Sequence, residues 1–172
     1  MRSNRRAEGG ADFRIGEGSD LHRLESGRRL VIGCVEVPSD VGSFGHSDGD
    51  VVAHAVCDAV LGALALGDIG THFPPTDERW RGADSRVFLV HAMRLARERG
   101  ARIVNVDVTV ELERPKLAPY LGDMRRELAR VLGCAAAAVS VKAKTAEGLG
   151  AVGEGKAIAA RAVVLLAVRS ST

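Results

Sequence analysis

Aromatic residues are scarce in this chain: they make up 3% of its 172 residues, as one tryptophan, one tyrosine and four phenylalanines. A surface for single-stranded nucleic acid needs several stacking side chains, so we do not expect one here. The charge points the same way, because 24 basic and 22 acidic residues leave a formal charge of +2 and no broad basic field. We therefore expect no nucleic-acid partner and no membrane-binding patch.

Closely spaced cysteines and long apolar runs are also missing. Cys34, Cys57 and Cys134 lie far apart, so neither a disulfide framework nor a thiolate zinc site is expected, and the reducing cytoplasm of a bacterium fits three buried thiols. No segment is apolar over the length that a bilayer requires. Residues 1–12 are polar and lack the apolar centre of a secretion signal, so a disordered tail is predicted there.

Apolar residues make up 46% of the chain, which is enough for one domain over residues 13–172. Strand patterns at 13–22, 30–37, 103–111, 139–143 and 157–168 are interspersed with helical patterns at 47–66, 85–100 and 120–132. Loops are expected at 39–45, 68–82 and 145–155, and Gly67 is expected to end the first helix. This order predicts an α/β (α+β two-layer) domain, in which helices cover one face of a mixed β-sheet.

Asp20 and His22 form the first candidate site. Side chains repeat every two residues along a strand, so this carboxylate and this imidazole face the same way. A catalytic zinc site takes three protein ligands, of which these would be two. The competing interpretation is a hydrogen-bonded pair at the end of a strand.

The helix that follows carries Asp50, His54 and Asp58 at a spacing of four, which forms one polar stripe. Such a stripe is usually a solvated face. This helix is otherwise almost wholly apolar and should be buried, and buried carboxylates and histidines need partners or a metal ion. Both interpretations stay open on spacing alone.

Two loops complete the candidate residues. Lys144, Thr145 and Glu147 follow a strand and precede glycines, an arrangement that suits a phosphate and a magnesium ion, although it is no P-loop and glycine-rich turns are common. The segment 67–77 reads either as two tight turns or as a site for sugar or polyol hydroxyls.

Together, these segments resemble the 2-C-methyl-D-erythritol 2,4-cyclodiphosphate synthase family, in order, from about Arg14 to Val168. The most specific match is His-Ser-Asp-Gly-Asp-x-x-x-His at 46–54. The other matching motifs are Gly-x-x-x-Asp-x-His at 16–22, Leu-Gly-Asp-Ile-Gly at 66–70, Gly-Ala-Asp-Ser at 82–85, Asn-Val-Asp-Val-Thr at 105–109, Arg-Pro-Lys at 114–116 and Lys-Ala-x-Thr-x-Glu-x-Leu-Gly at 142–150.

The resemblance implies a role for each segment. Asp20, His22 and His54 would bind Zn²⁺ or another divalent cation beside the substrate. His46 and Ser47 would contact its phosphates, and Lys144, Thr145 and Glu147 would lie at its diphosphate. His46, Thr145 and Glu147 would be the catalytic residues, and Glu147 would also reach a second ion, Mg²⁺ or Mn²⁺. The remaining substrate contacts would be Asp68, Ile69 and Gly70 at the ribose, Phe73, Thr76 and Asp77 at the methylerythritol, and Leu112, Lys116, Leu117 and Ala118 at the cytosine.

The implied reaction belongs to the non-mevalonate route to isoprenoids and terpenoids. The substrate would be 4-diphosphocytidyl-2-C-methyl-D-erythritol 2-phosphate, whose 2-phosphate attacks the β-phosphorus of its own diphosphate and releases CMP. Because the nucleophile belongs to the substrate, a Ser–His–Asp or Cys–His set is not needed. The resemblance also implies a homotrimer with its active sites between subunits.

The chain departs from the family pattern at several positions. Glu17 stands where His is usual and Ser19 where Phe is usual, and Lys144 replaces a common Thr. Near the end, Ala151 replaces a large or aromatic residue, and the usual Arg and Glu exchange sign as Glu154 and Lys156. In the family, that Arg faces a cavity on the trimer axis that can hold an isoprenoid diphosphate. We expect the swapped ion pair to keep the structure and to abolish anion binding there.

Two alternatives compete with the synthase. A zinc phosphoesterase on the same scaffold would use an activated water in place of the internal phosphate. A degenerate homologue would bind metal or nucleotide without catalysis, and the altered positions 144 and 151–156 give it some weight.

Overall fold

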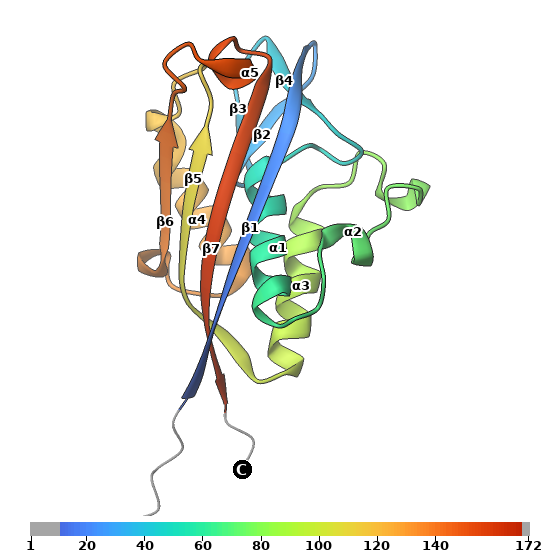
Figure 1. Cartoon of the computed structure of the whole chain (residues 1–172), viewed down its shortest axis with the longest axis vertical. Coiled ribbons are helices and arrows are strands. Elements are labelled where there is room, and N and C mark those ends of the chain that lie inside the picture. Colours follow the sequence, from blue (N-terminus) through green and yellow to red (C-terminus); the bar gives the residue numbers. More distant parts are fainter. Residues whose placement is uncertain (1–10, 170–172) are drawn as a thin grey trace, which may run out of the picture.

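The computed structural model describes residues 11–169. Its centre is a five-stranded mixed sheet with the strand order β4-β1-β7-β5-β6, in which β5 and β6 are parallel and the other neighbours antiparallel (Figure 1). Three long helices lie against one face of this sheet. The strands are β1 (Ala11–Ser26), β4 (Val41–Phe44), β5 (Ala101–Glu111), β6 (Val139–Lys144) and β7 (Ala157–Arg169), and the helices are α1 (Val51–Ala63), α3 (Arg86–Glu98) and α4 (Leu121–Leu132).

This arrangement confirms the predicted two-layer fold and the central position of the last strand. The strand β1 begins at Ala11, so the last two residues of the predicted tail belong to the sheet, and the rest of that tail lies outside the described residues. Within residues 11–169, no helix has both the length and the apolarity needed to cross a membrane.

The structure corrects the predicted strand over residues 30–37. This segment is a hairpin of β2 (Leu30–Ile32) and β3 (Val35–Val37), because Gly33 and Cys34 both adopt positive φ angles, of 57° and 65°, and turn the chain. Residues 41–44, predicted as part of a loop, form β4 at the edge of the sheet. Three short 3₁₀ segments are η1 (Glu78–Trp80), η2 (Ala118–Tyr120) and η3 (Ala136–Ala138).

The first helix is shorter than predicted. It begins after its N-cap Asp50, not at residue 47 or 48, and ends at Ala63, not Leu66. Gly67 does have a positive φ, but Ala65 turns the chain first, so Gly67 does not end the helix. The long loop that follows contains α2 (Ile69–His72), and the glycine-rich loop after β6 contains α5 (Gly150–Gly153).

The core lies between the sheet and the helices, and α1 is its centre. Eleven of the 13 residues of α1 are buried, and the helix lies directly on β1 and β7. This close approach depends on Gly18, where an added Cβ would lie 2.2 Å from the Ala55 carbonyl oxygen. The glycines of β1 therefore bring the strand against the helix at the level of Asp20.

The second face of the sheet has no helix on it within the described chain. Alternate residues of β1 on this face are exposed, with Phe13 at 65%, Ile15 at 71% and Leu21 at 63% of their surface, and Val163 of β7 is also exposed. Polar pairs lie farther across, including Lys142 and Asp107 at 2.5 Å. Large exposed apolar patches on a sheet mark an interaction surface.

Candidate metal and substrate site

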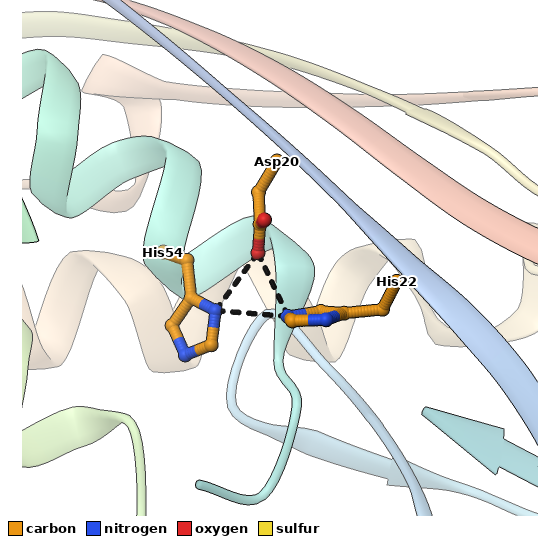
Figure 2. Close-up of side chains that lie close together, drawn as sticks. All are labelled: Asp20, His22 and His54. Atoms are coloured by element: carbon orange, nitrogen blue, oxygen red, sulfur yellow. Dashed lines mark hydrogen bonds and ion pairs between the residues drawn. The ribbon is translucent and has the colours of Figure 1, made fainter. Parts of the chain in front are cut away.

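Asp20, His22 and His54 lie within contact of one another (Figure 2). The strand spacing predicted that Asp20 and His22 face the same way, and the resemblance implied that His54 joins them. The Oδ2 atom of Asp20 lies 2.9 Å from His22 Nε2 and 2.8 Å from His54 Nδ1. The two ring nitrogens lie 3.2 Å apart. Strand β1 therefore supplies two of the three candidate ligands and helix α1 the third.

The position of His54 depends on Asp50, which is wholly buried. The Oδ1 atom of Asp50 accepts hydrogen bonds from the backbone N–H groups of Val52 and Ala53, and so caps α1. The same carboxylate accepts from Gly33 and Cys34 in the β2–β3 turn. Asp50 thus ties the start of the helix to the hairpin, and His54 follows one turn later.

The rest of the polar stripe also has a structural role. Asp58 accepts a hydrogen bond of 2.7 Å from the Ile69 backbone N–H, which fastens α2 to α1. Asp50 and Asp58 are therefore anchors, while His54 between them faces the candidate metal site.

The donor set fits a zinc ion. Bonds of roughly 2.0–2.2 Å to ligands at tetrahedral angles place ligand atoms about 3.3 Å apart, and the three atoms here need small movements to reach that spacing. The outer ring nitrogen of His54 also favours metal binding. His54 Nε2 donates to Ser85 Oγ at 2.9 Å, and Ser85 donates in turn to Asp48. This series of hydrogen bonds keeps the proton of the His54 ring on Nε2 and leaves the Nδ1 lone pair for an ion.

The electrostatics of the triad favour a cation. Burial alone would raise the pKa of Asp20, but hydrogen bonds and charges from His22 and His54 hold that pKa well below its usual range. Burial would lower the pKa of His54, whereas the bond to Asp20 and the charges of Asp20, Asp50 and Asp48 raise it above its usual value. The Asp20 carboxylate therefore stays ionised, and the site attracts a proton or a metal ion.

The triad opens into a cavity of about 240 Å³ that is mostly apolar opposite the ligands. Pro75, from the predicted segment 67–77, also lines this cavity, together with Trp80 and Phe88, which the sequence did not indicate. The lining of the cavity brings together eight of the predicted residues, which are Asp20, His22, His46, Ser47, His54, Ile69, Gly70 and Phe73.

Other predicted contacts point elsewhere in the single chain. The Asp68 carboxylate accepts from the Thr71 N–H and hydroxyl and caps α2. The Asp77 carboxylate pairs with Arg79, while the Asp77 carbonyl contacts His46 Nε2 at 3.2 Å. Thr76 is exposed and is not among the cavity residues.

The predicted phosphate and cytosine segments meet each other at the ends of β5 and β6. The Leu112 N–H donates to the Lys144 carbonyl, and the Ala146 N–H donates to Glu113. Thr145 Oγ1 donates to Glu147 Oε1 at 2.8 Å, and Glu147 has a φ of 51°. Among the other cytosine residues, Leu117 is buried, whereas Lys116 and Ala118 are exposed.

This second cluster does not line the cavity of the triad. Strand β7 and then β5 separate β1 from β6, and three steps between neighbouring strands amount to about 14 Å. Within one chain, the predicted site residues therefore form two separate groups.

The cysteines agree with their predicted role as small apolar side chains. All three thiols are free, with Cys34 and Cys57 buried and Cys134 partly buried. Burial raises the pKa of each, so none is a reactive thiolate.

The sequence matches the YgbB family over residues 13–167. It is 54% identical over 160 residues to the 2-C-methyl-D-erythritol 2,4-cyclodiphosphate synthase of Gloeobacter violaceus, covering 93% of this chain and 98% of the relative. It is 56% identical to the enzyme of the same name from Xanthomonas oryzae pv. oryzae, covering 90% of this chain and 95% of the relative. The match to a bifunctional IspD/IspF enzyme of Albidiferax ferrireducens, also 56% identical over 90% of this chain, spans 37% of that longer protein.

Solved structures agree with this assignment. A 2C-methyl-D-erythritol-2,4-cyclodiphosphate synthase in a CDP-bound form superposes with a TM-score of 0.82 at 46% identity, over 89% of this chain and 99% of that one. The CDP complex of IspF from Plasmodium falciparum superposes with a TM-score of 0.81 at 35% identity, over 92% and 97%. On sequence, fold and the Asp–His–His group alike, the chain belongs to the YgbB family, with the 2-C-methyl-D-erythritol 2,4-cyclodiphosphate synthases as its relatives.

Proposed function

We propose that the protein is a 2-C-methyl-D-erythritol 2,4-cyclodiphosphate synthase, a phosphorus–oxygen lyase. It would convert 4-diphosphocytidyl-2-C-methyl-D-erythritol 2-phosphate to the cyclic diphosphate and CMP. The observation that carries the proposal is the Asp20–His22–His54 group, which opens into a cavity in a chain 54–56% identical to named synthases. The intact triad argues against a degenerate binder.

The residues of the cavity suit a reaction in which the substrate attacks itself. The chain has to fold the substrate back and neutralise crowded phosphate charge, which contributes more to such a reaction than any protein nucleophile. His46 and Ser47 line the same cavity as the triad, and Ser47 Oγ lies 3.1 Å from His54 Nε2. Their polar atoms are the groups that would bind phosphate oxygens. The apolar side chains of Phe73 and Ile69 exclude water on the opposite side, which favours attack by the internal phosphate over hydrolysis.

The metal ions would be Zn²⁺ at the triad and Mg²⁺ or Mn²⁺ near Glu147. When bound, they supply charge stabilisation to the phosphate oxygens. The protein positions the two sets of ligands, with Asp20 and His22 held by β1 and Thr145 held by its hydrogen bond to Glu147. The hydroxyl of Thr145 and the imidazole of His46 are the groups that we expect to bind the transferring phosphate.

The active form would be a homotrimer with its sites between subunits. Two observations support this. In one chain, three strand spacings, or roughly 14 Å, separate β1, which carries Asp20 and His22, from β6, which precedes Thr145. The second face of the sheet also exposes Phe13, Ile15 and Leu21. A neighbouring copy that covers the apolar face would bring its own Thr145 cluster to the cavity. The nucleotide would then bind across the interface.

A mixing experiment tests the shared site. His54→Ala and Thr145→Ala should each be inactive alone. When the two variants are unfolded, mixed in equal amounts and refolded, random trimers should regain about a quarter of the wild-type sites, because the two intact halves then come from different chains. A site built within one chain predicts no recovery.

The exchanged charges at positions 154 and 156 form an ion pair, with Lys156 Nζ at 2.6 Å from Glu154 Oε2. Three copies of Glu154 near a threefold axis would repel a diphosphate. We therefore expect calorimetric titration with geranyl or farnesyl diphosphate to give no heat of binding. Binding at micromolar concentrations would contradict this expectation.

The product identifies the reaction. Incubation of the zinc- and magnesium-loaded protein with the substrate should give CMP and a cyclic diphosphate in ³¹P spectra. His54→Ala should give neither, and the exposed Glu98→Gln should match the wild type. CMP together with an open-chain bisphosphate would identify a hydrolase instead, and no turnover by the folded wild type would identify a binder. We also propose a cytoplasmic location in a bacterial cell, which fits the three free thiols and is tested by cell fractionation.

A further inference from the structure

A second pair of histidines lies outside the triad, between helices α2 and α3. His72 and His91 are both half-buried, and His72 Nδ1 lies 3.3 Å from His91 Nε2. Their ring centroids are 5.2 Å apart, and the rings stand nearly edge to face, at 61°. Neither residue belongs to the cavity of the candidate active site.

The geometry of this pair repeats that of the two histidines in the triad. His22 and His54 have ring nitrogens 3.2 Å apart, centroids 5.3 Å apart and an interplanar angle of 73°. In both pairs the two nitrogens face each other at about the 3.3 Å spacing of neighbouring ligands on a tetrahedral ion. The arrangement that suits a metal in the triad is therefore present twice in this chain.

The outer nitrogen of His72 also has the partner that a metal-binding histidine requires. His72 Nε2 donates to the Leu66 carbonyl oxygen at 2.9 Å, which keeps the proton on Nε2 and directs the Nδ1 lone pair toward His91. Backbone carbonyls in this position fix the tautomer of a ligating imidazole. His91 completes the pair when its own proton moves to Nδ1.

We propose that His72 and His91 form a second site for a divalent transition-metal ion, such as Zn²⁺, Ni²⁺ or Cu²⁺, with water at the remaining positions. Imidazole is the ligand that this class of ion prefers, and hard oxygen-binding ions such as Mg²⁺ are not expected to bind. Because the pair lacks a carboxylate ligand, binding is weaker than at the triad.

The surrounding charges are compatible with this site. Arg94, one turn along α3, is paired with Glu98 at 2.5 Å, and this offsets its repulsion of a cation. Burial is the main cause that lowers the pKa of His91, so a proton competes little for this imidazole; the smaller effect of the Arg94 charge acts against a cation as well as against a proton.

An ion bound by His72 and His91 would connect α2, and the residue Phe73 that follows it, to helix α3. Phe73, the next residue after His72, lines the cavity. Its ring centroid lies 4.9 Å from that of His91, edge to face, and 4.6 Å from that of Phe88, in a tilted arrangement. A bond from α2 through the ion to His91 would hold Phe73 against α3. The binding itself does not depend on which reaction the cavity performs.

Metal counting tests the site. Full-length protein is freed of metal with a chelator and titrated with Zn²⁺ alone by calorimetry. The wild type should bind two ions per chain in two classes, whereas His91→Gln and His72→Gln should each bind one. The double variant His22→Ala/His54→Ala, which removes both imidazoles of the triad, should lose the tighter class and keep the weaker one. Arg94→Gln, which changes the charge beside the pair and none of its ligands, should still bind two.

A measurement on the wild-type protein tests the site without requiring that any variant folds. Once one equivalent of Zn²⁺ has filled the triad, a second equivalent should shift the imidazole ¹⁵N resonances of His72 Nδ1 and His91 Nε2. Unchanged resonances, a single ion per wild-type chain, or two ions in folded His91→Gln and His72→Gln would each overturn the proposal.

Discussion

The carboxylate of Asp50 is buried and has no cationic partner among the described residues. It accepts hydrogen bonds only from backbone N–H groups. Its Oδ1 atom accepts from Gly33, Val52 and Ala53, and its Oδ2 atom accepts from Cys34. Burial raises the pKa of this group and the backbone bonds oppose that rise. With only donors around it, the carboxylate is the form that fits, and a neutral amide would not.

Asp50→Asn should therefore lower the free energy of unfolding by about 3 kcal/mol, because the amide NH₂ must face at least one N–H group and leave it unsatisfied. Urea denaturation of the metal-free protein measures the change. Asp40→Asn makes the same chemical change at an exposed carboxylate and should stay within about 0.5 kcal/mol of the wild type. Equal effects of the two substitutions would refute the anchoring role of Asp50.

The triad predicts a pH window in the metal-free protein. The lowered pKa of Asp20 gives stability that is present above the unfolded value of about 3.9 and is lost as the pH falls through the folded value. The raised pKa of His54 gives stability that is present below about 6.5 and is lost as the pH rises through its folded value.

The difference in unfolding free energy between wild type and Asp20→Asn, measured in the presence of a chelator, should therefore be largest between about pH 4 and 6.5. It should decline toward pH 9. Zinc should remove that decline, since the ion takes the place of the proton. A difference that grows from pH 6.5 to 9 without metal would show that the assigned charges are wrong.

Site residues differ in how far the sequence alone could reveal them. The two-residue period of a strand placed Asp20 and His22 on one face, but their metal role, and that of His54, came from the family resemblance. Phe88 was missed, because it reaches the site from α3, more than thirty residues after His54, and nothing local marks it. Ser85 belongs to the matching motif at 82–85, but its contact with His54 was not predicted. That the triad and Thr145 lie apart within one chain could not be predicted from the sequence, because it depends on the order of the strands in the sheet.

At the level of elements, the packing of β1 on α1 sets the position of the metal ligands. Gly18 lies two residues before Asp20, and a Cβ there would meet the Ala55 carbonyl oxygen at 2.2 Å and the Ala59 nitrogen at 2.7 Å. Both are backbone atoms of a buried helix, which cannot move aside on their own. A methyl group at Gly18 must therefore push β1 and α1 apart.

Gly18→Ala should destabilise the protein by roughly 2–3 kcal/mol and weaken Zn²⁺ binding at the triad. Thermal denaturation and metal titration measure the two effects. Gly62→Ala is the matched control: it lies on the exposed side of α1, its nearest atom is 3.8 Å away, and it should stabilise the helix by up to about 1 kcal/mol. If folded Gly18→Ala binds zinc with normal affinity, the close contact of β1 with α1 does not set the position of the zinc ligands.

Elements with a long, regular pattern were predicted correctly, including α3, α4, β5 and β7. The errors lie where distant contacts decide. Residues 30–37 read as one apolar strand because a non-glycine residue, Cys34, rarely takes the positive φ that turns the chain. The first helix starts at Val51 because Asp50 is held by the Gly33 and Cys34 N–H groups, a restraint that the local sequence does not contain.

For the whole molecule, the exposed apolar face of the sheet predicts association. The native mass should be three times the 18.1 kDa of the chain. Ile15→Glu, which places a charge at a 71% exposed position on this face, should give monomers and no activity. Val90→Glu makes a similar change at a 53% exposed position on α3 and should stay trimeric. Light scattering distinguishes these outcomes, and a trimeric, active Ile15→Glu would place the interface elsewhere.

A crystal structure of the protein with Zn²⁺, Mg²⁺ and CDP is the most direct test of the account. Anomalous scattering should place zinc on Asp20 Oδ2, His22 Nε2 and His54 Nδ1 of one chain. The diphosphate should lie between that ion and Thr145 of a neighbouring copy, with cytosine against residues 112–118. Zinc bound away from these three atoms, or a nucleotide held within a single chain, would contradict it.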